Sequence, residues 1–186
     1  MNASSLALFL HIVGALGFFA AMGLEWTGLR EIRSATLPAQ VRSWLGIVKN
    51  ASQLAMPFML TLVITGFYMV MTDVGWVAWI LVVLGALVFG MALSLAVSRP
   101  RLAALGQALS MERESLSGSF HKLANQPLLW ISVQVRIMLG LGIVFLKIAQ
   151  PDLGMSLLVI GVSVVLGLAS AWSVNRPLRA GQPSTD

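Results

Sequence analysis

The sequence predicts an all-α fold, a polytopic transmembrane helical bundle of five spans with its N-terminus outside and its C-terminus in the cytoplasm. Of the 186 residues, 58% are apolar and only 10% are charged, whereas a soluble domain carries about 25% charged residues. Five apolar runs are long enough to cross the hydrocarbon core, which takes about 20 helical residues. The basic residues lie in alternate links between these runs, and this alternation sets the orientation.

The five runs predict one helix followed by two hairpins, all within a single transmembrane domain over residues 1–186. The link at 72–76 is short and contains Gly75, and the link at 149–152 contains Pro151. Tight links of this kind join antiparallel neighbouring helices. The predicted spans are 6–29, 54–71, 77–97, 128–148 and 153–174.

Ten basic residues follow the first, third and fifth spans and so share one side of the membrane. They are Arg30, Arg33, Arg42, Lys49, Arg99, Arg101, Arg113, Lys122, Arg176 and Arg179. Only Lys147 lies near the other side, alongside Asp73 and Asp152. The positive-inside rule places the ten in the cytoplasm, so we expect a bacterial-type inner (plasma) membrane protein whose partner is the lipid bilayer. The same distribution argues against nucleic acid as a partner, despite the net charge of +5.

Two cytoplasmic segments, 38–50 and 101–114, have an amphipathic pattern. Pro38 is suited to the first position of a helix. The apolar face of the first segment comprises Val41, Trp44, Leu45 and Val48. We expect an interfacial helix here that leads into the second span. The six tryptophans fall near span ends, as in an ordinary interfacial aromatic belt.

Polar residues inside the spans are the candidate functional groups, because they are costly in lipid. His11 and Glu25 are 14 residues apart in the first span, so they differ by only about 40° in direction. Arg136 lies about 12 Å into the fourth span and needs an acidic partner. Glu25 is the only acid inside a span at that end, so we expect the two to be close, directly or through Gln134 or Gln53. An arginine at this depth could also hold an anionic head group or a propionate.

Two readings of His11 stay open at this point. It could make a structural hydrogen bond to a neighbouring group, or it could be a metal ligand, a haem ligand or a proton carrier. Small residues recur every seven positions on the same helix, at Ala7, Gly14, Ala21 and Gly28. Such a stripe allows close approach of another helix, within this chain or in a homo- or hetero-oligomer.

Methionines near the outer side suggest copper. Met69 and Met71 end the second span there, Met155 begins the fifth, and His11 lies in the same half. Thioethers with an imidazole suit Cu(I), although methionine is also an ordinary apolar filler. The absence of cysteine excludes thiolate metal sites and cysteine nucleophiles. The common nucleotide-binding, zinc-protease and Ser/His/Asp motifs are also absent, and we predict no catalytic residue.

The segment Leu10-His11-Ile12-Val13-Gly14-Ala15 resembles the L-H-x-x-x-A/G opening of small bacterial membrane bundles. These include copper-resistance-D-type proteins and the J-type protoporphyrinogen oxidase. Residues 136–151 resemble uncharacterised integral membrane proteins of the same loose group. The resemblance implies that His11 handles haem or a metal. The oxidase pairs its histidine with a lysine in a later span, and the sequence offers no lysine at a matching depth.

The leading hypothesis is a bundle that binds haem b or copper. His11 would contact the ligand, and Glu25, Arg136 and Gln134 would form an inner polar cluster. One alternative is a non-enzymatic accessory or assembly subunit of a membrane complex that associates through small-residue helix faces. Another is a small transporter, which would need broken spans in both hairpins, and Pro57 interrupts only one.

Overall fold

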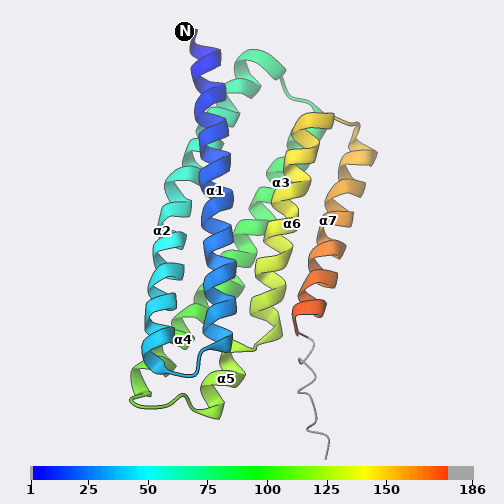
Figure 1. The fold of residues 1–186 in the computed structure, drawn as a ribbon. Helices are drawn as coiled ribbons and strands as arrows, with labels where there is room; N and C mark the ends of the chain where they lie inside the picture. Colours follow the sequence, from blue (N-terminus) through cyan, green and yellow to red (C-terminus); the bar gives the residue numbers. More distant parts are fainter. Residues whose placement is uncertain (1, 176–186) are drawn as a thin grey trace, which may run out of the picture.

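In this computed structural model, which describes residues 2–175, the regular elements are all helices (Figure 1). In chain order they are α1 (Ala3–Ser34), α2 (Pro38–Met69), the π-helical η1 (Val70–Val74), α3 (Ala78–Leu93), the π-helical η2 (Ser94–Ser98), α4 (Arg99–Met111), α5 (Gly118–Ala124), α6 (Pro127–Ala149) and α7 (Leu153–Asn175).

Five continuous helical stretches are long and apolar enough to cross a membrane, which confirms the predicted fold class. They are Ala3–Ser34, Pro38–Val74, Ala78–Met111, Gly118–Ala149 and Leu153–Val174. Most are longer than the predicted spans because the flanking segments continue the same helices. The N-terminus and the links around Gly75 and Pro151 lie at one end, here called the N-terminal end (Figure 1). The link from α1 to α2 and the link from α4 to α5 lie at the opposite end, here called the basic end because most of the basic residues lie on the helices near it, while Arg176 and Arg179 fall outside the described residues (Figure 1).

The amphipathic segments 38–50 and 101–114 differ from the prediction, because protein covers their apolar faces. Pro38 does occupy the first turn of a helix, but that helix runs without interruption to Met69. Residues 101–111 belong to α4, which continues α3 through η2. Val41 and Val48 are fully buried in a core with Leu105 of α4. These segments are therefore the basic end of the bundle rather than separate helices lying on a lipid surface.

The basic end of the bundle contains a hydrophobic core to which α1, α2, α4, α5 and α6 contribute side chains. Phe120 of α5 and Trp130 of α6 are buried in it, and the indole Nε1 of Trp130 donates to the carbonyl of Ala124 at 3.2 Å. Arg33 lies over the Trp130 ring and donates from Nη1 to the carbonyl of Val174 at 2.7 Å. A basic side chain on the last carbonyls of a helix is favourable, so Arg33 fastens the end of α7 to α1.

The small-residue stripe of α1 is used inside the chain. Ala7, Gly14, Ala21 and Gly28 are all buried. A Cβ on Gly14 would lie 3.2 Å from the carbonyl oxygen of Phe58 on α2, and one on Gly28 would collide with Val48. The stripe thus lets α1 and α2 pack closely along each other. It is not free to bind a partner subunit, so the accessory-subunit hypothesis loses this surface.

The two predicted hairpins have different outcomes. The α6–α7 hairpin packs extensively, as predicted. Helices α2 and α3 are joined by the predicted short link but hardly touch each other, because α2 packs on α1 while α3 packs on α6. In Figure 1 the α2–α3 link arches over the N-terminal end, and α3 descends obliquely toward α4. The separation of α2 from α3 creates the groove described below.

The orientation of the bundle can be tested by single-cysteine labelling, since the chain has no cysteine of its own. Asp73→Cys and Ser119→Cys place a thiol at exposed positions of the N-terminal end and the basic end, respectively. In intact cells an impermeant maleimide is expected to label the first variant but not the second, which should react only after permeabilisation. Labelling of Ser119→Cys in intact cells would overturn the predicted orientation.

Candidate functional site

A groove runs between α2 and α3, and its floor is formed by α1 and α6. It contains two neighbouring cavities that share Leu87 and Ile143 in their walls. The His11 cavity, of about 190 Å³, is lined mainly by apolar side chains together with His11. The Arg136 cavity, of about 300 Å³, is lined by Glu25 and Arg136 and is more polar. The three ionisable residues predicted from the sequence therefore all lie along one groove.

The ring of His11 is held in one orientation by Thr65 of α2. Nδ1 lies 3.0 Å from the Thr65 hydroxyl, and that hydroxyl donates its only proton to the carbonyl of Thr61. With the hydroxyl donating to that carbonyl, Nδ1 is the donor to Thr65, which in a neutral imidazole leaves the lone pair on Nε2. Gly66 makes room for the ring, because a Cβ there would lie 3.2 Å from Cε1 of His11. Within residues 2–175, the side-chain hydrogen bond of His11 is made through Nδ1, and none is made through Nε2.

Lys147 of α6 lines the same cavity as His11, contrary to the expectation that no lysine matches its depth. Its Nζ lies 5.8 Å from the centre of the Trp79 ring, which is 7% exposed. The sequence placed Lys147 near a link because it lies close to the end of its span. A lysine side chain is long and flexible, however, and its stem lies readily along apolar surface. The contact with Trp79 also shows that this tryptophan is not part of a lipid-facing belt.

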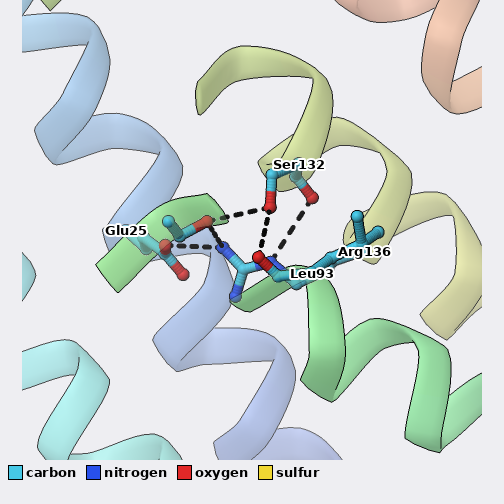
Figure 2. Close-up of polar contacts among 5 residues, drawn as sticks. Glu25, Leu93, Ser132 and Arg136 are labelled. Carbon is cyan, nitrogen blue, oxygen red and sulfur yellow. Dashed lines mark hydrogen bonds and ion pairs between the residues drawn. The ribbon is translucent and has the colours of Figure 1, made fainter. Parts of the chain in front are cut away.

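The predicted ion pair between Glu25 and Arg136 is confirmed, and it is direct. Nη2 of Arg136 lies 2.6 Å from Oε1 of Glu25, and the two side chains are 13% and 9% exposed. Figure 2 shows the guanidinium between α1 and α6, where its Nε also donates to the carbonyl of Ser132 at 3.4 Å. A buried charge needs such partners, because an unpaired one carries a large desolvation cost.

A chain of hydroxyl groups continues from this pair to α3. Arg136 Nη2 donates to Oγ of Ser98 at 3.3 Å, the hydroxyls of Ser98 and Ser132 are 2.9 Å apart, and Ser132 donates to the carbonyl of Leu93 at 3.3 Å. When Ser132 donates to Leu93, Ser98 is the donor in the contact between the two hydroxyls. The guanidinium of Arg136 is thereby tied to both α6 and η2.

Ser98 and Ser132 were not among the residues predicted from the sequence. The available signal was a serine four residues before Arg136, one turn away on the same face of α6. Ser98 could not be placed, because it reaches Arg136 from a π-helical segment, η2, that the apolar pattern does not reveal. Such π-helical turns occur frequently at functional sites.

Gln134 and Gln53 do not belong to this cluster, which corrects the sequence prediction. Two residues along a helix point in nearly opposite directions, so Gln134 faces away from Arg136. Its Nε2 donates to the hydroxyl of Ser170 on α7 at 2.6 Å. Gln53 is exposed on α2. Gln134 therefore joins α6 to α7 and does not line either cavity.

The predicted copper ligands do not converge. Met69 is buried and lines the His11 cavity, but Met71 and Met155 are 57% and 51% exposed and line neither cavity. In the part of the chain that the structure describes, no group of three or more His, Cys, Asp or Glu side chains is placed to hold a metal ion. Of the four proposed ligands, only His11 and Met69 share a site.

The groove also separates His11 from the ion pair. Their 14-residue spacing in α1 corresponds to about 21 Å along the helix axis. His11 lines one cavity of the groove, and Glu25 and Arg136 line the other. The single predicted cofactor site is thus two sites in one groove, with His11 and Lys147 in one and Glu25 and Arg136 in the other.

Comparisons with known proteins give no match for this chain, either among family models or among curated proteins and solved structures. The groove is therefore the feature of the chain that bears on its function. The groove offers an imidazole nitrogen with a free lone pair in apolar surroundings. It also offers the Glu25–Arg136 ion pair, whose side chains line the Arg136 cavity.

Proposed function

We propose that this chain, in a bacterial-type plasma membrane, binds an apolar cofactor in the His11 cavity, with His11 as the contacting group. The observation that carries the proposal is the fixed imidazole. Thr65 holds Nδ1, and Nε2 is left without a partner among the described residues, at a cavity with apolar walls. Both walls of the groove are spanning helices, so a ligand would enter from the lipid phase.

Haem b is the ligand that these residues fit best. A histidine whose second nitrogen is hydrogen-bonded is a common arrangement for a metal-bound imidazole. The cavity walls, which include Leu62, Phe67 and Val83, are apolar, and a macrocycle, which is larger than this cavity of about 190 Å³, would extend past Leu87 along the groove. The resemblance of the first span to the J-type oxidase adds support, because Lys147 lies at the same cavity as His11. Bound haem would supply one-electron redox chemistry.

Copper is the weaker alternative. Cu(I) prefers several soft ligands, and the cavity offers only His11 together with Met69. Within this proposal His11 would hold the iron of haem, while Thr65 would keep the ring in position. Lys147 would place an amine at the N-terminal end of the cavity.

Titration of the purified chain with hemin in detergent tests this proposal. The wild type is expected to give a saturable Soret band at one haem per chain, and His11→Ala is expected to lose it. Thr65→Val should weaken binding by about 10- to 100-fold, since it removes the group that orients the ring. His121→Ala is the matched control, because His121 lies in α5 at the basic end.

Two results would overturn the proposal. One is the absence of a saturable Soret band in the wild type. The other is a His11→Ala variant that binds hemin as well as the wild type does. Metal analysis of the same preparation, purified without chelators, separates the two cofactors. One equivalent of copper per chain that is lost in His11→Ala would identify copper, and not haem, as the ligand.

A further inference from the structure

The buried ion pair has donor and acceptor capacity that the protein does not use. Among residues 2–175, Arg136 makes its hydrogen bonds through Nε and Nη2, and none involves Nη1. Glu25 accepts through Oε1 alone. Nη1 of Arg136 has no partner among the described residues and is not fully buried. Because Arg136 lines the cavity, this nitrogen keeps some contact with it. The two N–H groups of Nη1 are therefore available to a ligand.

The charge of this cavity favours an anion. Arg99, at the start of α4, also lines the cavity, and its exposed side chain makes no ion pair within the described part of the chain. Arg99 and Arg136 together carry two positive charges against the one negative charge of Glu25. The hydroxyl-bearing residues Ser94 and Ser98 line the same space. The wall is thus a cationic surface with further hydrogen-bonding groups.

The shape of the groove favours a lipid over a free ion. Beyond the charged groups the cavity is walled by apolar side chains such as Met59 and Met91. It continues past Leu87 and Ile143 into the apolar His11 cavity. Both walls are membrane-spanning helices, so the groove opens toward the acyl chains of the bilayer.

We propose that the Arg136 cavity binds the head group of an anionic phospholipid. The phosphate would lie between Arg99 and Nη1 of Arg136, and an acyl chain would lie along the groove toward Leu87. Basic pockets between helices at the cytoplasmic side are suited to such head groups. The head-group site and the haem proposal rest on different polar residues, because the head-group site uses neither His11 nor Lys147, and the two cavities share only the walls at Leu87 and Ile143.

The test measures lipid binding to the full chain purified in a neutral detergent. Phosphatidylglycerol and phosphatidylcholine are titrated separately, with native mass spectrometry and the melting temperature as readouts. We expect saturable binding of phosphatidylglycerol, weaker binding of phosphatidylcholine, and no stabilisation by inorganic phosphate. Arg99→Gln should weaken phosphatidylglycerol binding roughly fivefold. Arg30→Gln, which removes an exposed charge at the same end, is the matched control and should leave binding unchanged.

Glu25→Gln gives a result of opposite sign. The amide oxygen can still accept from Arg136, but the cavity gains one net positive charge. The variant without added lipid should melt at a lower temperature, while its affinity for phosphatidylglycerol should rise roughly fivefold. A purely structural role of Glu25 would not strengthen lipid binding.

Three results would overturn the proposal. Equal effects of Arg99→Gln and Arg30→Gln would indicate non-specific charge attraction. Stabilisation by inorganic phosphate alone would indicate a site for free anions. Equal binding of phosphatidylcholine would remove the requirement for an anionic head group.

Discussion

Arg136→Met is expected to lower the free energy of unfolding of the bundle by about 3–5 kcal/mol. The substitution leaves the carboxylate of Glu25 buried without its positive partner. It also removes the donors that hold Ser98 and the carbonyl of Ser132. The loss can be measured by reversible denaturation in mixed micelles, followed by circular dichroism.

The matched double variant separates the cost of an unpaired charge from the value of the pair itself. Glu25→Leu combined with Arg136→Met removes both charges and should recover most of the stability lost in the single variant. Arg113→Met, at an exposed position, should change stability by less than about 0.5 kcal/mol. A double variant as unstable as the sum of its two single variants would contradict this account, because the two residues would then act independently.

The Glu25–Arg136 pair could be predicted from the sequence because lipid leaves few choices. An arginine about two turns inside a span needs an acid, and only one acid lies inside a span at the same end. The five spans could be predicted for a similar reason, because lipid admits only long apolar helices. In both cases one physical requirement leaves a single solution among the available residues.

The groove could not be predicted, because it depends on which helices pack together. A short link makes two helices neighbours along the chain. The small residues of α1, however, allow α2 to pack closely on α1, and α2 hardly contacts α3. The apolar pattern of residues 38–50 predicts an amphipathic helix but does not say whether lipid or protein covers it. Trp130 shows the same limit, because it lies near a span end yet is fully buried among α1, α5 and α6.

The composition of the candidate site depended on helix direction and side-chain reach. Depth in the span predicts Gln134 beside Arg136, but residues two positions apart on a helix point in nearly opposite directions. The position of Lys147 near the end of its span predicts a residue close to a link, whereas its side chain lines the cavity of His11. Depth along each span was thus predictable from the sequence, whereas the face of α6 that meets each neighbour required the structure.

Gly167→Ala is expected to destabilise the α6–α7 hairpin by about 1–3 kcal/mol. A Cβ on Gly167 would lie 2.6 Å from the Cα atom of Val135 in α6, and backbone cannot rotate out of the way as a side chain can. The two helices would have to move apart, which would also strain the hydrogen bond from Gln134 to Ser170.

Gly161→Ala is the matched control on the same helix. Gly161 is exposed, and a Cβ there meets no atom within 4 Å. Replacing glycine by alanine in an open helical position should stabilise the helix by up to about 1 kcal/mol. The two variants are therefore expected to shift the denaturation midpoint in opposite directions, although they make the same chemical change. If both variants stabilise the bundle, the close approach of α7 to α6 at Val135 is wrong.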